Sequence, residues 1–488
     1  MVQPEQVTEH AGTVRMTPDT SRRRAIVLVI VIALITEIVT FEYTLVSPAL
    51  PNIAAAFHTT QPGLVITTTM LVAGVTAPVL AKLADIHGKK KLLLCGAASF
   101  MVGSLACAIA PTFPVLLVGR GLQGVAVVGV VVSIGLIRDL LPPRYVPVAI
   151  GAIGVGTGTG SILGPLLGGW FIDNLGFRAC FWFLLAYMAV AAAIVATIVP
   201  ETPVRIRHRL DLLGAVLLGL GVGALIVAAV RPDLRVPSAV VGVVMLVAFV
   251  QAERRTSEPL MSMTLLARPA VWTTLVAALF IGVISGATSV LFPQLLRSPA
   301  QPGESGSGMG FDAVEFALYY GLPQGIAGCA CGFVAGWISR RHAPRTALIV
   351  AAGLLTCAVS LTAAGLADTH GMVVLVGALM GAGIGMYYSG SANLIVEAVP
   401  ANTQSVSQSM KNTAEAVAGS FASAAVGAIL AAHVLTVDPT THQTVFPTSG
   451  FHTAFLLCSA SGVLALLVAV AMRTGRTPAT GGVAPGTE

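Results

Sequence analysis

Fourteen apolar runs of roughly 20 residues recur along this chain of 488 residues. A helix needs about 20 apolar residues to cross the hydrocarbon core of a bilayer, and inside the bilayer it satisfies its own backbone hydrogen bonds. We therefore predict an all-α integral membrane protein with fourteen transmembrane helices. The runs lie near residues 25–46, 63–84, 92–110, 114–137, 147–170, 180–199, 212–230, 237–251, 270–296, 313–338, 346–367, 372–395, 405–431 and 452–472.

The composition leaves no room for a sizeable water-soluble domain. Only 10% of the residues are charged, against about 25% in soluble proteins. The seven cysteines lie mostly inside the apolar runs and show no CxxC or metal-ligand spacing, which is typical of apolar packing residues. We therefore expect neither an enzyme nor a nucleic-acid-binding protein, and no metal or organic cofactor.

The basic residues divide unequally between two sets of loops. With a cytoplasmic N-terminus, 21 of the 27 Lys and Arg residues fall in cytoplasmic segments. Positive charge accumulates on the cytoplasmic side of membrane proteins, so we expect both termini to lie in the cytoplasm, in a multi-pass protein of the cell (cytoplasmic) membrane. Two basic residues, Arg120 and Lys411, lie within apolar runs and are candidates for function. The four basic residues expected in external loops are Arg178, Arg231, Arg235 and Arg297.

A glycine stripe marks the fifth apolar run. Between Gly154 and Trp170 the chain reads GVGTGTGSILGPLLGGW, and a glycine at every fourth position falls on one face of a helix. Such a face lets a second helix approach closely, while Pro165 is expected to kink its own helix. Packing alone explains a bare glycine run, but the added Gly-Pro and Gly-Gly pairs are more specific. The residues concerned are Gly156, Gly160, Gly164, Gly168 and Gly169.

The segment from Gly160 to Gly169 resembles GxxxGPxxGG, the fifth-helix signature of antiporters in the major facilitator superfamily. The resemblance implies two six-helix bundles around a central cavity that opens alternately to each side of the membrane. It also implies export of small molecules, driven by protons that move inward.

Two acids lie in the apolar body of the first run, where a carboxylate is costly to place. Glu42 begins EYTLVSPALP, which resembles DxTIVNVALP, the first-helix signature of the superfamily's fourteen-span drug/proton antiporters. Glu42 stands where that signature has Asp, and Pro48 stands where it has an apolar residue. The resemblance implies a proton-coupling role for Glu42. Glu37 is a second candidate for proton coupling, or it faces a neighbouring polar helix.

Arg120 lies in the fourth run, within RGLQG. A buried Arg costs about 2.5–3.5 kcal/mol on insertion scales, so we expect this residue to have a partner or a role. The segment resembles the superfamily's RxxqG signature, whose Arg takes part in proton coupling, and Glu42 is the expected partner. A purely structural ion pair is the alternative.

A basic loop follows the second run. The segment AKLADIHGKKKLL resembles the superfamily's GxLaDrxGrkxxl signature, with Asp85, Gly88, Lys89 and Lys90 at motif positions. The resemblance implies a gating loop that latches the outward-open state, and topological charge alone is the alternative. The matching loop of the second half, GWISRRHAPR, stays basic but has Arg340 in place of the acid, which indicates two similar halves.

The second half offers further substrate candidates. Glu315 begins the tenth run, where it contacts substrate or only lies at the membrane interface. Tyr387 and Tyr388 in the twelfth run line a cavity or pack. Glu415 follows Lys411 by four residues, so the pair shares one helix face and can neutralise itself, although the family tends to place polar or acidic residues in this span.

The resemblance also divides the chain into five parts. We expect a cytoplasmic tail over residues 1–24 and an N-terminal six-helix bundle over 25–199. A linker with two additional transmembrane helices covers 200–256, and the C-terminal six-helix bundle covers 257–473. Residues 474–488 have the composition of a disordered cytoplasmic tail.

The expected function is proton-coupled export of hydrophobic small molecules such as drugs, with the proton gradient as energy source. The candidate acids outnumber Arg120 and Lys411, which favours cationic or neutral substrates. Expected partners are the substrate, protons and the lipid bilayer, and no nucleic acid.

Three alternatives stay open. A proton-coupled nutrient importer should lack the glycine stripe. An exporter of one native metabolite, siderophore, lipid or peptide is a second alternative that nothing in the sequence excludes. A non-transporting scaffold or sensor has no need of the buried charges Glu37, Glu42 and Arg120.

Overall fold

The computed structural model describes residues 22–142, 146–202, 210–256, 259, 261, 263–299, 308–399, 404–433, 436–437 and 444–477. The two predicted tails lie largely outside these residues. Almost all of the described chain is helical.

Six long helical segments form the first half, and short helices interrupt or extend two of them. They comprise α1 (Arg22–Val46), η1 (Ser47–Ala49), α2 (Leu50–Phe57), α3 (Leu64–His87), α4 (Lys89–Ile109), α5 (Phe113–Gly124), η2 (Val125–Val128), α6 (Gly129–Leu140), α7 (Val146–Leu175) and α8 (Arg178–Ile198).

Two helices follow the first half and precede the second. They are α9 (Leu212–Val230) and α10 (Arg235–Arg255), joined by η3 (Pro232–Leu234). The second half comprises α11 (Met263–Leu266), α12 (Pro269–Arg297), α13 (Ala313–Phe316), η4 (Ala317–Gly321), α14 (Leu322–Arg341), α15 (Pro344–Ala363), α16 (His370–Ala398), α17 (Gln404–Ala432) and α18 (Thr448–Ala471). Between α17 and α18 the short strands β1 (Thr436–Val437) and β2 (Thr444–Val445) pair antiparallel, with Thr436 opposite Val445.

Thirteen helical segments among the described residues are long and apolar enough to cross a bilayer. The helix α7 adds a further segment of 30 residues and packs against α1 and α14. The prediction of an all-α membrane protein is therefore confirmed, and the helix count agrees with fourteen spans.

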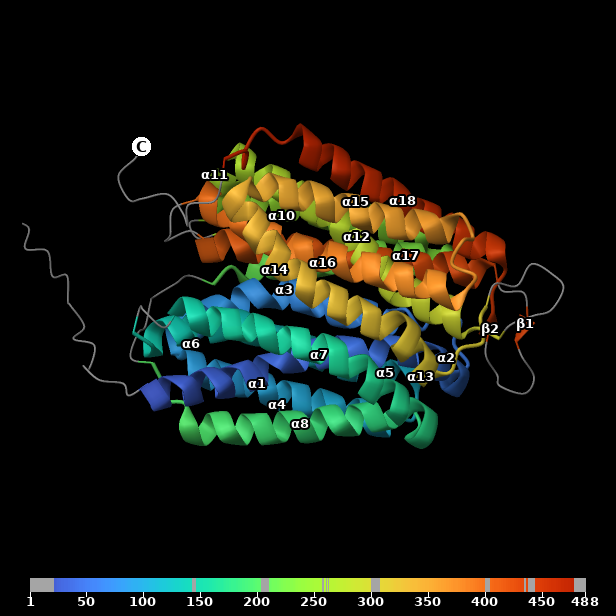
Figure 1. Cartoon of the computed structure of the whole chain (residues 1–488), viewed down its shortest axis with the longest axis horizontal. Coiled ribbons are helices and arrows are strands. Elements are labelled where there is room, and N and C mark those ends of the chain that lie inside the picture. Colours follow the sequence, from blue (N-terminus) through green and yellow to red (C-terminus); the bar gives the residue numbers. More distant parts are fainter. Residues whose placement is uncertain are drawn as a thin grey trace, which may run out of the picture.

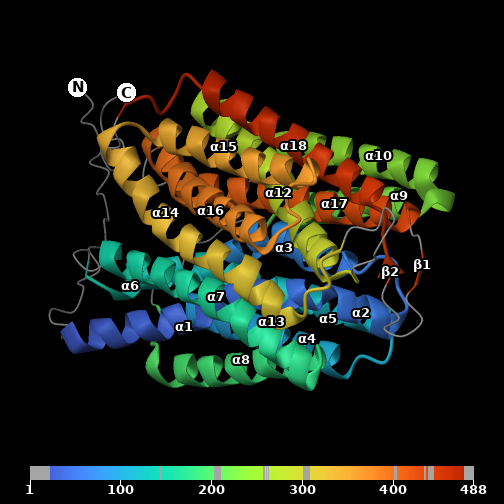
Figure 2. The ribbon, with the colours of Figure 1, turned by 45° about the vertical axis from the view of Figure 1, so that its right-hand side comes forward.

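The helices form two side-by-side groups (Figure 1). Helices α1 to α8 lie on one side, and α12 to α18 lie on the other. The groups meet where α3 packs on α17 and α7 packs on α14. The pair α9–α10 lies at the edge of the second group (Figure 2), where α9 touches both α3 and α17. We call the end that carries α2, α13 and the two strands the α2 end.

The outer faces of the helices are apolar, as a lipid solvent requires. Val236, Val240 and Val243 on α10 are 72%, 57% and 55% exposed. Exposed valines of this density would be unfavourable in water, so these faces are suited to contact with acyl chains.

Prolines explain two irregular stretches. Pro48 lies in the single 3-10 turn between α1 and α2, and Pro323 lies in the first turn of α14, directly after the π-helical turn η4. A proline has no amide hydrogen to complete the preceding helical turn, so the turn tightens or widens. By contrast, α7 continues through Pro165.

Candidate functional site

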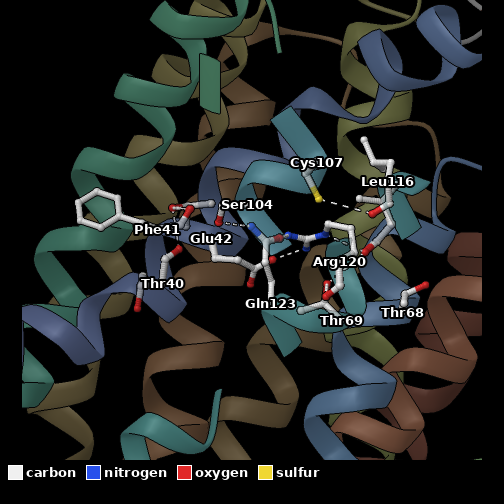
Figure 3. A network of polar contacts seen from close by, with 12 residues as sticks. Thr40, Phe41, Glu42, Thr68, Thr69, Ser104, Cys107, Leu116, Arg120 and Gln123 are labelled. Atoms are coloured by element: carbon white, nitrogen blue, oxygen red, sulfur yellow. Dashed lines mark hydrogen bonds and ion pairs between the residues drawn. The ribbon is translucent and has the colours of Figure 1, made fainter. Parts of the chain in front are cut away.

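A buried ion pair joins α1 to α5 in the first half (Figure 3). The side chain of Arg120 is 1% exposed, and its Nη2 pairs with Oε1 of Glu42, which is 6% exposed. A lone charge in the membrane interior is costly, and a close opposite charge offsets part of that cost. The structure thus pairs the two residues expected to be partners, while their role in proton coupling stays a prediction.

Hydrogen bonds surround the rest of the Arg120 guanidinium. Its Nε donates to the Val65 carbonyl at 3.1 Å, and its Nη1 donates to Oε1 of Gln123 at 2.6 Å. Gln123 in turn donates through Nε2 to Oγ of Ser104 at 2.8 Å. Helices α1, α3, α4 and α5 therefore all contribute to one network, which fixes the guanidinium in place.

Gly124, the second glycine of RGLQG, explains how α3 comes close enough to α5 to contact Arg120. A Cβ added to Gly124 would lie only 2.7 Å from the carbonyl oxygen of Thr69 on α3. Thr69 also donates through Oγ1 to the Arg120 carbonyl at 3.3 Å. The close approach of α3 and α5 thus depends on a residue without a side chain.

Glu37 lies on the same helix as Glu42 and faces α7. A Cβ added to Gly160 would lie 3.2 Å from Oε1 of Glu37. This oxygen is buried and has no hydrogen-bond partner among the described residues. Glu37 therefore stays a candidate for proton coupling, next to the glycine stripe.

The glycine stripe packs against α1. A Cβ added to Gly164 would overlap the Thr44 hydroxyl and lie 2.8 Å from the Thr44 Cβ. At Gly168, an added Cβ would lie 3.2 Å from Cα of Leu45. These contacts let α7 approach the helix that carries both candidate acids; the packing of Gly156 lies outside the described residues.

Gly169 and Pro165, the other two residues of the motif, face the second half instead. A Cβ added to Gly169 would lie 2.6 Å from the Ala313 carbonyl oxygen, and one added to Gly321 would lie 2.5 Å from Cβ of Pro165. The helix α7 therefore packs closely on α1 of its own half and on the second half. We expect its glycines to affect any movement of one half relative to the other.

The basic loop forms a charged cluster within the first half. Lys89 Nζ lies 2.7 Å from Oδ2 of Asp139 at the end of α6 and 3.1 Å from Oδ1 of Asp85. Gly88 between α3 and α4 has φ 118°, a backbone region that favours glycine. The predicted gating residues thus lie together, and Asp139 is an additional partner that the motif did not reveal.

A second missed acid binds the start of α4. Glu201 accepts hydrogen bonds from the amides of Lys90 at 3.1 Å and Lys91 at 3.0 Å. Lys90 also donates through Nζ to the Ala196 carbonyl at 2.7 Å. A carboxylate at a helix N-terminus binds free amides and stabilises the helix dipole, so Glu201 anchors the loop to α8.

The second half contains a cluster of two tyrosines, one acid and one base. Tyr387 and Tyr388 on α16 donate to the two oxygens of Glu415 on α17, at 3.0 and 2.8 Å. Lys411 Nζ lies 3.5 Å from Oε2 of Glu415. Three substrate candidates and the predicted i, i+4 pair therefore form one group.

Glu315 lies apart from this cluster. It forms a capping box with Asp312 at the start of α13, where Asp312 Oδ1 accepts from the Glu315 amide at 2.6 Å. Oε2 of Glu315 accepts from the Asp312 amide at 3.2 Å. Its observed contacts serve the helix start, and a contact with substrate stays a prediction.

Polar contacts join the two halves at the α2 end. Asp173, near the end of α7, accepts from the amides of Ala313 at 3.0 Å and Val314 at 2.8 Å. Ser47 donates through Oγ to the Ser289 carbonyl at 2.7 Å. These bonds keep the α2 end closed.

Arg297 contributes to the same closure and corrects an expectation. The sequence places it in an external loop, but it is the last residue of α12 and only 6% exposed. Its Nη1 donates to Oδ1 of Asn52 at 2.8 Å and to the Pro48 carbonyl. The end of an apolar run does not show whether an Arg there lies in a loop or binds a neighbouring helix. The only signal in the sequence is that Arg297 directly follows the apolar run.

Comparison with known proteins identifies the family. The sequence model of the Major Facilitator Superfamily matches residues 32–423 and 325–488. The uridine/deoxyuridine transporter of Lactococcus lactis is 28% identical, over 76% of this chain and 79% of that protein. The multidrug resistance protein Stp of Mycobacterium tuberculosis is also 28% identical, over 81% of this chain and 74% of that protein.

Solved structures agree at the level of the fold. A bacterial homologue of the human lysosomal transporter Spinster, in an inward-facing and unoccupied conformation, superposes with a TM-score of 0.66 at 15% identity, over 95% of this chain and all of that one. A D-xylose–proton symporter gives a TM-score of 0.65 at 12% identity, over 94% and 99% of the two chains. This chain therefore belongs to the major facilitator superfamily, and it is a multi-pass membrane transporter rather than an enzyme.

Proposed function

We propose that this transporter is an antiporter of the cell membrane, which exports hydrophobic cationic or neutral small molecules such as drugs in exchange for protons. The observation that supports the proposal best is the buried Glu42–Arg120 pair. Both termini would lie in the cytoplasm, and the closed α2 end would face outward.

Glu42 is the proposed proton carrier. Transfer from water into the membrane interior favours the neutral form of a carboxylic acid, whereas the adjacent Arg120 favours the carboxylate. The balance between these two effects would change as the halves move and expose Glu42 to one side or the other. A proton taken up from outside would neutralise Glu42 and weaken its pairing with Arg120, and release inward would restore the pair.

The glycine stripe and one relative support the direction of transport. The contacts of Gly164 and Gly168 with α1 fit the antiporter signature, and the relative Stp is named a multidrug resistance protein. The uridine/deoxyuridine transporter supports a second candidate function, proton-coupled transport of a nucleoside. The direction and substrate of transport distinguish the two.

Inside-out membrane vesicles test the direction. With the interior made acidic, an exporter of this kind accumulates ethidium, and a protonophore stops the accumulation. Accumulation that survives the protonophore contradicts proton coupling. Proton-driven uridine uptake by right-side-out vesicles in an acidic medium, without ethidium accumulation by inside-out vesicles, favours the nucleoside candidate.

The variants Glu42→Gln and Glu42→Asp test the carrier. An amide resembles the protonated acid but releases no proton, so Glu42→Gln should bind substrate and lose gradient-driven transport, while Glu42→Asp should keep much of it. A pH dye follows proton release on substrate binding in detergent. Wild-type proton release from the Gln variant would assign the role elsewhere, with Glu37 the next candidate.

A further inference from the structure

The cluster in the second half has the composition of a site for an organic cation. The aromatic rings of Tyr387 and Tyr388 lie with their centroids 5.0 and 5.2 Å from Lys411 Nζ, and the Glu415 carboxylate lies 3.5 Å from the same atom. Aromatic faces within about 6 Å attract a cation, and such cages recognise ammonium groups. In this structure, the cation in the cage belongs to the protein.

The Lys411 ammonium is poorly satisfied in that position. It is fully buried, and Nζ makes no hydrogen bond to any of the residues that the structure describes. An ammonium has three donors, and a buried donor without an acceptor costs free energy. Lys411 is therefore stabilised there by charge and by the rings, the same two interactions that any other ammonium would receive.

The carboxylate, in contrast, is positioned by its neighbours. Both of its oxygens accept phenol hydrogen bonds. The backbone beneath it is also fixed, because a Cβ added to Gly282 on α12 would lie only 2.5 Å from the Glu415 carbonyl oxygen. The negative charge and the rings therefore form a preorganised receptor.

Parts of this receptor are more accessible than the ammonium that occupies it. Tyr388 is 50% exposed and the Glu415 side chain 13% exposed, whereas Lys411 is 1% exposed. An incoming molecule thus meets the Tyr388 ring and the carboxylate before it meets the ammonium.

We propose that Glu415, Tyr387 and Tyr388 form the binding site for an organic ammonium or phosphonium substrate, and that Lys411 is a tethered competitor that occupies the site in the absence of substrate. The proposal rests on the proposed export of apolar cations and names the residues that recognise their charge. A bound cation takes over the pairing with Glu415, and a neutral ligand of the same size gains nothing from the carboxylate.

Equilibrium dialysis in detergent tests the proposal with two probes of similar size, the tetraphenylphosphonium cation and uncharged triphenylphosphine oxide. Lys411→Met removes the competitor, so it should bind the cation about tenfold more tightly. Glu415→Gln and Tyr388→Leu should weaken cation binding about tenfold and about fivefold, while Tyr388→Phe keeps the ring and changes it about twofold. The affinity for the neutral probe should stay within about twofold in all four.

The control is Lys91→Met, the same substitution at an exposed lysine, which should leave both affinities unchanged. The double variant Lys411→Met/Glu415→Gln should bind the cation no better than Glu415→Gln alone, because the gain requires the carboxylate. Thermal unfolding confirms that each variant is folded. If a variant at a buried position does not fold, Tyr388→Leu still tests the proposal, because Tyr388 is half-exposed.

Weaker cation binding by Lys411→Met overturns the proposal, because it would make Lys411 a ligand for an acceptor group on the substrate. Unchanged cation binding by Lys411→Met and Tyr388→Leu also overturns it and leaves the cluster a structural element. Since the assay uses neither a gradient nor sealed vesicles, a failure of proton-driven export would leave these outcomes unaffected.

Discussion

Each half of the molecule contains a buried acid–base pair inside its apolar helices, Glu42–Arg120 in the first half and Glu415–Lys411 in the second, and these two pairs are built differently. In the first half, the guanidinium of Arg120 pairs with Glu42 and donates hydrogen bonds to two further acceptors. In the second half, the ammonium of Lys411 lies 3.5 Å from Glu415 and makes no hydrogen bond within the described chain.

The chemistry of the two cations accounts for the difference. A guanidinium is planar and has five donors in fixed directions, so several helices can bind it at once, whereas an ammonium is a compact charge on a flexible stem. The Arg120 guanidinium is therefore fixed by several hydrogen bonds, whereas, among the described residues, the Lys411 ammonium is held only by the charge of Glu415 and by the two tyrosine rings. In the proposed mechanism, the first pair changes its state when Glu42 takes up a proton, whereas the second exchanges its cation.

Removal of Arg120 should give the largest effect on stability. In Arg120→Met, the carboxylate of Glu42, the carbonyl of Val65 and the amide of Gln123 all lose a buried partner. We expect a loss of about 3–5 kcal/mol in the free energy of unfolding, measured by thermal and denaturant unfolding in detergent. The double variant Glu42→Gln/Arg120→Met has no unpaired charge and should recover much of this loss, and a single variant as stable as wild type would show that the network is not rigid.

Added bulk in the glycine stripe should cost less. In Gly164→Ala, the new methyl group meets Thr44, and overpacking of this kind costs about 2 kcal/mol; transport should fall strongly because α1 carries Glu42. The matched control is Gly353→Ala on α15, where an added Cβ has nothing within 4 Å and alanine favours the helix. Equal unfolding temperatures for the two variants would contradict the close contact in the first half.

The bonds between the halves should give a smaller shift. Asp173→Asn removes the negative charge and one of the two oxygens that accept from the amides of Ala313 and Val314. We expect the free energy of opening at the α2 end to become about 1.5 kcal/mol more favourable. Spin labels on α2 and α13 report that opening as a longer distance. Asp233→Asn breaks an exposed pair with Arg231 instead, which contributes little, and it should leave the distances unchanged.

The smallest effect on stability is expected at Lys411. In Lys411→Met, no hydrogen bond is lost and Glu415 keeps both phenol donors. We therefore expect the free energy of unfolding to fall by only about 1 kcal/mol. A loss as large as that of Arg120→Met would remove the contrast between the two pairs.

Much of this arrangement could be predicted from the sequence, because in a bilayer apolar length alone identifies the helices. The ionisable residues in the runs also led to Glu42, Arg120, Glu415 and Lys411, since a charge at that depth is costly without a partner. The structure pairs them as expected.

Three of the residues that the sequence did not reveal bind main-chain groups. Asp173 and Glu201 bind backbone amides, and Arg297 binds a backbone carbonyl. Every residue except proline has both groups, so no pattern of side chains marks which amide or carbonyl will be the partner. Their position at the ends of apolar runs, where charges are ordinary, conceals them further.

The same property has an evolutionary consequence at the α2 end. Asp173 and Ser47 of the first half bind main-chain atoms of the second half, and these atoms are present in every residue type except proline, which has no amide hydrogen. Substitutions in that part of the second half can accumulate without loss of the bonding groups. A lineage could thus alter its substrate range while the closure between the halves is inherited unchanged.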